Sequence, residues 1–164
     1  MKYAIVYESV TGNTKLLADT IKDVLGDDVV YCGKPASVEA DCFIVGSWTD
    51  KGQCSEGIKT FLSSLNNKTI IYFGTAGFGG SEAYFKALEE RMKTYITDTN
   101  KYLGAFYCQG KMLISVKERY VSLLREHPED SKLQVSLKNF EEALTHPDDN
   151  DLNNLKTWIK GLIY

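Results

Sequence analysis

Residues 7–14 read YESVTGNT and lie between an apolar run and the start of a helical pattern. A turn between a strand and a helix exposes free backbone N–H groups at the positive end of the helix dipole. The turn adds three hydroxyl groups, one amide and a glycine that lets the backbone approach a ligand closely. We therefore predict a nest for a phosphate group, formed by Ser9, Val10, Thr11, Gly12, Asn13 and Thr14.

The sequence of this turn excludes some kinds of phosphate-containing ligand. Its first lysine is Lys15, already on the helix, and the glycine spacing of a nucleoside triphosphatase loop is missing. The G-x-G-x-x-G pattern of dinucleotide sites is missing too, which disfavours a pyrophosphate. The donors favour a single phosphate monoester bound by neutral groups. The alternative is an ordinary capped helix without a ligand.

A second cluster follows the apolar run at residues 41–46. It reads GSWTDKGQC from Gly46 to Cys54. Trp48 offers a flat face on which a planar ring can stack, although it could also pack under its own loop. Gly52 permits a change of backbone conformation there. The candidate ligand-binding residues of this loop are Ser47, Trp48, Thr49, Asp50 and Gly52.

A third cluster, GTAGFGG at residues 74–80, leaves backbone groups free to meet the edge of a ring. Phe78 offers a second apolar face. The candidates here are Thr75, Ala76, Gly77 and Phe78, and we expect Gln109, after a later strand, at the same rim. Together the clusters describe a phosphate at one end of a site and a planar heterocycle at the other.

The elements that must position these clusters alternate along the chain. Strand-like runs occupy residues 2–7, 29–32, 41–46, 69–74 and 102–108, and helical patterns occupy 15–25, 56–65 and 81–94. Strands that are apolar on both faces and alternate with helices indicate an α/β fold with a parallel sheet covered on both sides. Right-handed crossovers make the sheet doubly wound, with its site at the carboxyl ends of the strands.

From Met112 onward the pattern is only helical, and we predict one domain over residues 1–164 with residues 112–146 inserted before the last helix. Two joints, at 127–130 and 146–149, look like helix starts with a proline in the first turn. We therefore assign His127 and His146 a structural role at these helix starts and not a role as ligands. The inserted helices either pack against the domain, which we favour, or form a face for a partner protein.

Composition excludes some classes of function. A net charge of −3 argues against non-specific nucleic-acid binding. No run is long and apolar enough to span a membrane, and no signal region is visible, so we expect a cytoplasmic protein. The spacing of the cysteines fits no metal site. Cys32, Cys42 and Cys108 read as buried small hydrophobes, whereas Cys54 is expected in an exposed loop.

The sequence also resembles a known family. The run S-V-T-G-N-T matches the phosphate loop of flavodoxins, [ST]-x-T-G-x-T, and Gly46-Ser47-Trp48 matches their first ring-binding loop. The resemblance covers roughly residues 1–110 and the last helix. It implies FMN as the cofactor and a five-stranded sheet in the order 2-1-3-4-5. The third loop lacks the family's G-D-Q-x-x-Y pattern, so Phe78, or else Tyr84, is the candidate for the outer face of the flavin.

The resemblance implies an FMN-binding electron carrier without a catalytic acid or base, in which a carbonyl near residues 50–52 meets N5 of the flavin. It also implies redox partner proteins: a donor such as a ferredoxin or flavodoxin reductase, and an acceptor reductase. The chain resembles an anaerobe-type subgroup of short flavodoxin-domain proteins in its C-Q-G-K-M run and its two H-P-[DE]-D joints. Some members of this subgroup accompany bilirubin-reducing flavoenzymes. The alternatives are an NAD(P)H-dependent FMN or quinone reductase and a module that has lost its flavin.

Overall fold

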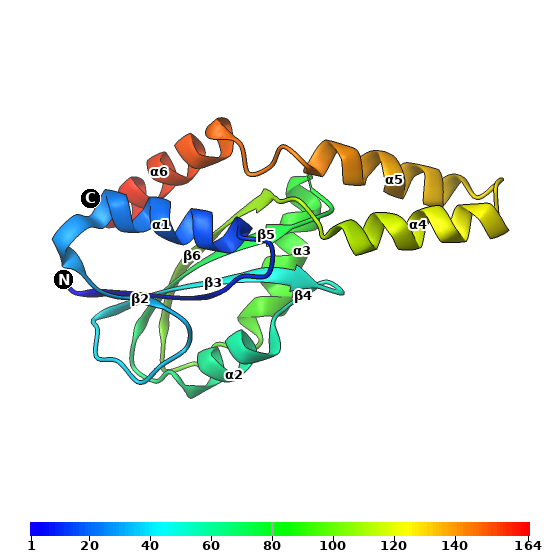
Figure 1. Cartoon of the computed structure of the whole chain (residues 1–164). Coiled ribbons are helices and arrows are strands. Elements are labelled where there is room, and N and C mark those ends of the chain that lie inside the picture. Colours follow the sequence, from blue (N-terminus) through cyan, green and yellow to red (C-terminus); the bar gives the residue numbers. More distant parts are fainter. Residues whose placement is uncertain (80) are drawn as a thin grey trace.

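The structure, a computed structural model, describes residues 1–79 and 81–164, so Gly80 of the third cluster lies outside the described residues. Figure 1 shows a central sheet with helices on both faces and a long pair of helices that extends beyond it. The strands are β1 (Tyr3–Glu8), β2 (Val29–Gly33), β3 (Cys42–Asp50), β4 (Gln53–Cys54), β5 (Thr69–Ala76) and β6 (Lys101–Gln109). The helices are α1 (Asn13–Leu25), the short 3-10 helix η1 (Gly26–Asp28), α2 (Glu56–Ser64), α3 (Glu82–Lys93), α4 (Ile114–Glu126), α5 (Ser131–Ala143) and α6 (Asp149–Ile163).

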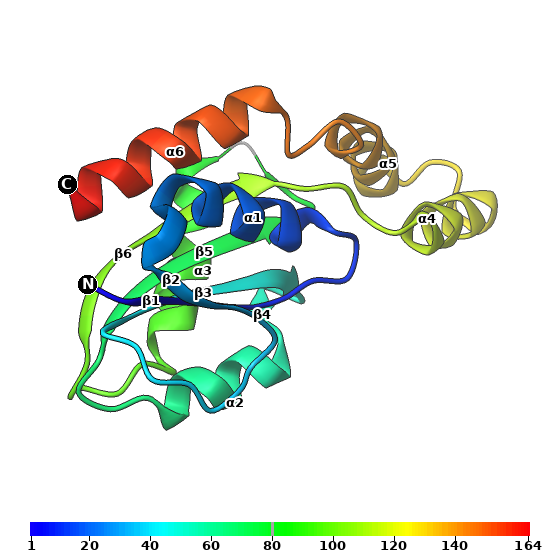
Figure 2. The same ribbon diagram turned by 60° about the vertical axis from the view of Figure 1, so that its left-hand side comes forward.

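The sheet has the predicted topology. Five parallel strands follow the order β2-β1-β3-β5-β6, and the short β4 pairs antiparallel with β3. Helices α1 and α6 cover one face and α2 and α3 the other (Figures 1 and 2). The order reverses where β1 meets β3, which in doubly wound sheets is where ligands bind. This confirms the doubly wound α/β fold and its strand order.

Two apolar cores hold the three layers together. On the α1 side, Leu17 and Ile21 of α1 and Leu155 and Ile159 of α6 pack on alternate residues of the strands, such as Ile44. On the other face, Ile58 and Leu62 of α2 and Met92 of α3 pack on the residues between, such as Phe43 and Tyr72. Both faces of β3 are therefore buried, which explains the nearly continuous apolar run of this strand.

Strand β3 is longer than predicted. It was expected to end at Gly46, but it continues to Asp50 because β4 folds back on it, pairing Thr49 with Cys54. The two residues between these strands, Lys51 and Gly52, both have positive φ, the conformation of a tight hairpin turn. Trp48 therefore stands on a strand and not in a flexible loop.

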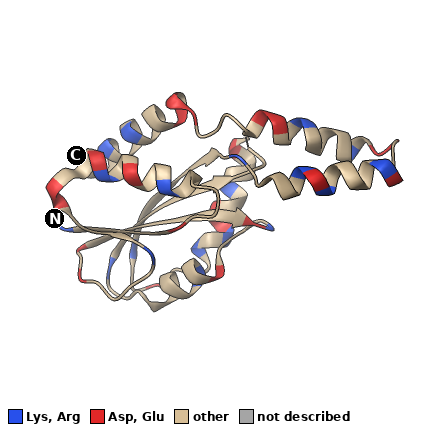
Figure 3. Ribbon diagram, in the orientation of Figure 1, with Lys and Arg blue, Asp and Glu red and all other residues tan. Residues whose placement is uncertain are grey.

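Helices α4 and α5 form a hairpin whose far end projects away from the sheet (Figures 1 and 2). Phe140 and Ala143 of α5 are buried, and Lys117 of α4 pairs with Glu141 of α5 at 2.6 Å. Acidic and basic residues are mixed along both helices (Figure 3). Of the helices that the structure describes, none is both long and apolar enough to cross a membrane.

The helix joints differ from the prediction in detail. Asp130 and Asp148 are the N-cap residues of α5 and α6, so Pro128 and Pro147 lie ahead of the helices and not in their first turns. The aspartates take the cap positions because their carboxylates accept the free N–H groups of the first turn.

Candidate functional site

The three predicted clusters meet at one cavity of about 460 Å³ at the carboxyl ends of β1, β3 and β5. Its volume lies in the range of small-molecule sites. Most of the predicted residues line it: Val10, Thr11, Asn13, Trp48, Thr49, Asp50, Gly52, Thr75, Ala76, Gly77 and Phe78. The cavity lies at the point where the strand order reverses. Residues that are far apart in sequence are therefore gathered around one space, as the sequence predicts.

Five predicted residues do not line this cavity: Ser9, Gly12, Thr14, Ser47 and Gln109. The hydroxyl of Ser9, which lines the adjoining cavity, accepts the backbone N–H groups of Gly12 and Lys15. Thr14 is buried, with its hydroxyl 3.3 Å from that of Thr75. Ser47 donates to the Trp48 carbonyl, and Gln109 donates to the carbonyl of Gly77.

The predicted phosphate loop leads directly into the N-terminus of α1. Gly12 precedes α1 with a φ of 91°, which disfavours other residues. Helix α1 begins at Asn13, two residues earlier than predicted, so the N–H groups of Asn13 and Thr14 belong to its first turn. That turn carries no acidic residue. The Asn13 amide donates to the Lys111 carbonyl at 2.8 Å, which fixes the loop against the end of β6.

Trp48 stands on β3 between two cavities. It is half-buried, opposite Thr75 of β5 in the sheet register, and it lines both the 460 Å³ cavity and an adjoining one of about 710 Å³. Its neighbour Thr49 donates to the Thr75 carbonyl at 2.7 Å. The strand therefore holds the indole at the cavity wall while the side chain keeps an accessible surface.

Both candidates for a second aromatic wall border the cavity. Phe78 is 44% exposed, whereas Tyr84 on α3 is half-buried. Burial raises the pKa of the Tyr84 phenol, so this side chain is neutral near pH 7. The choice between the two residues stays a prediction.

Cys54 contradicts the sequence-based expectation. It was predicted in an exposed loop, but β4 carries it into the core beside α2, where only 7% of it is exposed. Burial raises the pKa of its thiol to about 11. The short run Gln53–Cys54 has no periodicity of its own, and only its pairing with β3 reveals it as a strand.

One group of cavity residues was missed entirely. Met112, Leu113, Val116, Arg119 and Tyr120 line the cavity from the segment after β6 and the first half of α4. The helical period of α4 predicts an amphipathic helix, but it does not say which neighbour the apolar face meets. No local signal in the sequence could have placed this helix at the site.

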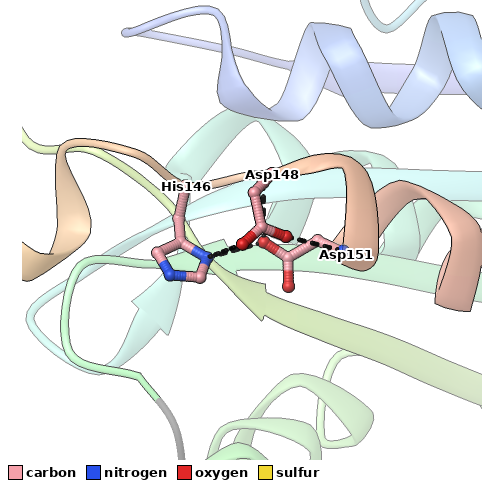
Figure 4. Close-up of side chains that lie close together, drawn as sticks. All are labelled: His146, Asp148 and Asp151. Atoms are coloured by element: carbon pink, nitrogen blue, oxygen red, sulfur yellow. Dashed lines mark hydrogen bonds and ion pairs between the residues drawn. The ribbon is translucent and has the colours of Figure 1, made fainter.

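His146 lies in a cluster with Asp148 and Asp151 at the start of α6 (Figure 4). The His146 Nδ1 is 2.7 Å from a carboxylate oxygen of Asp151. Asp148 and Asp151 each accept the other's backbone N–H, and the Asp151 N–H lowers the pKa of Asp148. These contacts form a capping box. The structural role predicted for His146 agrees with this arrangement.

Comparison with known proteins places the chain in a family. The model of the flavodoxin domain matches residues 4–160. The chain is 39% identical over 172 residues to the flavodoxin-like domain-containing protein BilS of Clostridium symbiosum, covering 93% of this chain and 90% of the relative. It is also similar in fold to a flavodoxin of Streptococcus pneumoniae, with a TM-score of 0.59, 18% identity and coverage of 99% and 97% of the two chains.

A further structural neighbour is a flavoprotein of Lactobacillus acidophilus that was solved in complex with FMN. Its TM-score is 0.51 and its identity 16%, over 65% of this chain and 93% of that one. FMN, the cofactor that the sequence resemblance implies for this chain, is the ligand in that neighbour. The chain belongs to the flavodoxin domain family.

Proposed function

We propose that the chain binds FMN in the 460 Å³ cavity and acts as an electron-transfer flavoprotein. The observation that carries this proposal is that the 460 Å³ cavity brings Thr11 and Asn13 of the phosphate loop together with Trp48 and Phe78 at the switch point of the sheet. The donor set fits the cofactor, because hydroxyl groups and helix N–H groups suit a phosphate and the aromatic walls suit a planar ring.

Each end of the cavity has a separate task in this proposal. At the phosphate end, the hydroxyl of Thr11 and the N–H groups at the start of α1 would bind the phosphate, with Ser9 and Thr14 holding the loop in shape. At the other end, Trp48 would cover one face of the ring, with Phe78 or Tyr84 at the second aromatic wall. When bound, FMN supplies the redox chemistry, and the side chains orient it and exclude water.

The hairpin turn between β3 and β4 is the proposed neighbour of flavin N5. The Gly52 carbonyl already accepts a hydrogen bond from Arg91 Nη1 at 3.2 Å. The carbonyls of Asp50 and Lys51 are therefore the better candidates to hold the N5 proton. A tight turn with two residues at positive φ fixes the direction of these peptide groups.

A carrier and an NAD(P)H-dependent reductase can share this fold, because function depends on the site. We favour the carrier, since the sequence has no second nucleotide fingerprint. Its partners, a reductase that donates electrons and an acceptor such as a bilirubin-reductase-type flavoenzyme, stay predictions from the sequence resemblance, as does a cytoplasmic location.

Anaerobic mixing of the FMN-loaded protein with NADH or NADPH separates the two functions. For a carrier we expect the yellow absorbance of the flavin to persist with either nucleotide and to disappear with dithionite, which shows that the flavin is reducible. Rapid bleaching by NADH or NADPH alone would instead identify a reductase.

A further inference from the structure

One side of the cavity comes from outside the three loops described above. It consists of Met112, just before α4, and of Val116, Arg119 and Tyr120 on the first half of that helix. These residues give the cavity an apolar wall with a phenol and a guanidinium group in it. The hairpin therefore contributes directly to the site, although its far end projects away from the sheet.

The base of the hairpin is tied to the third loop. The Asn139 side chain of α5 donates to the Gly77 carbonyl at 2.9 Å, and Gln109 bridges the same carbonyl and the Asn139 side-chain oxygen. The Met112 side chain occupies the space where a Cβ of Gly77 would be. The third loop and the α4–α5 hairpin are thus held together at Gly77. The α4 side of the cavity therefore has a defined position relative to Phe78.

Tyr120 is the polar group of this wall. Only 9% of it is exposed, and its hydroxyl takes part in none of the hydrogen bonds found among residues 1–79 and 81–164. Within these residues, no fully enclosed side-chain nitrogen or oxygen lacks a partner. The Tyr120 hydroxyl is therefore not fully enclosed, and Tyr120 is one of the residues that line the cavity. Tyrosine hydroxyls usually have a hydrogen-bond partner when they are buried, so the Tyr120 hydroxyl is able to donate to a ligand in the cavity.

Arg119 stands beside it. Its guanidinium carbon lies 5.9 Å from the centre of the Tyr120 ring. Among the described residues it forms no ion pair with a carboxylate, whereas Lys117 on the same helix pairs with Glu141. Arg119 thus adds a positive charge to this wall of the cavity.

We propose that α4 forms an additional wall of the FMN site and that the Tyr120 hydroxyl donates a hydrogen bond to the bound cofactor. The inference rests on the proposed function, which assigns FMN to this cavity. The hairpin is then part of the cofactor site and not only an appendage of the domain. Cofactor binding should also order the first half of α4 through contact with Met112, Val116 and Tyr120.

Tyr120→Phe tests the hydrogen bond, because it removes the hydroxyl and keeps the ring. A neutral hydrogen bond of ordinary strength corresponds to a loss of affinity of about threefold to tenfold. We expect this loss when FMN is titrated into the full-length apoprotein and its fluorescence is followed. The control is Tyr164→Phe, at an exposed position at the end of the chain, which should bind like the unaltered protein.

Amide hydrogen exchange of the unaltered protein gives a second readout that needs no variant. Addition of FMN should slow exchange in residues 112–120 and leave the far end of the hairpin near residues 127–130 unchanged. If the unaltered protein binds FMN but Tyr120→Phe binds it equally well, the hydrogen bond is refuted. If exchange in α4 also stays the same, the wall is refuted while the proposed function stands. Failure of the unaltered protein to bind FMN would refute both.

Discussion

Trp48→Ala is expected to weaken FMN binding by about tenfold to a hundredfold, the range that loss of one aromatic stacking partner of a planar base produces. The indole is held by β3 at the wall of the cavity, opposite Thr75 in the sheet register. The dissociation constant of FMN, measured by fluorescence quenching, checks this. The redox potentials of bound FMN should shift as well, because the ring loses an apolar cover.

Two further variants complete this experiment. Trp48→Phe keeps an aromatic face and should recover most of the lost affinity. Trp158→Phe is the control, because Trp158 packs on Phe106 in the layer of α6 and does not line the cavity. Unchanged affinity and potentials in Trp48→Ala would remove this residue from the site.

Gly46→Ala should destabilise the folded protein strongly. Gly46 lies on β3 opposite Phe73 of β5, and an added Cβ would overlap the Phe73 ring, which is itself fully buried. Inserting a methyl group into a packed core typically costs about 1–3 kcal/mol. For a chain of this length we expect the melting temperature to fall by roughly 3–10 °C, measured by calorimetry or circular dichroism.

Gly161→Ala is the matched control for this prediction. Gly161 lies in α6, and an added Cβ would meet no atom within 4 Å. Alanine is the better helix former, so this change should leave the melting temperature equal or raise it slightly. An unchanged melting temperature of Gly46→Ala would contradict the close contact between Gly46 of β3 and the Phe73 ring of β5.

The parts of the molecule that could be predicted from sequence are those with a local signal. The turn from Ser9 to Thr14 combines donors and a glycine between two periodic segments, so both the turn and the helix after it are visible in the sequence. The buried strands appear as apolar runs because both of their faces are covered. Trp48 and Phe78 were placed at the cavity because each lies within four residues after the end of one of these runs.

The parts that could not be predicted depend on contacts between distant segments. Cys54 looks exposed until β4 is seen to pair with β3, and the length of β3 depends on the same pairing. The apolar faces of α4 and α5 are compatible with any neighbour. Only the contacts of Asn139 and Met112 with Gly77 place α4 at the cavity. The missed residues Arg119 and Tyr120 therefore have no pattern in the sequence that marks them as ligand-binding.

FMN is proposed to bind in the 460 Å³ cavity, with its phosphate at the loop from Ser9 to Thr14. The most direct measurement is a titration of the full-length apoprotein with FMN and, in parallel, with riboflavin, which lacks the phosphate. We expect a yellow complex with one FMN per chain, quenched flavin fluorescence and clearly weaker binding of riboflavin. Equal binding of both would contradict the phosphate site, and absence of FMN binding would contradict the account as a whole.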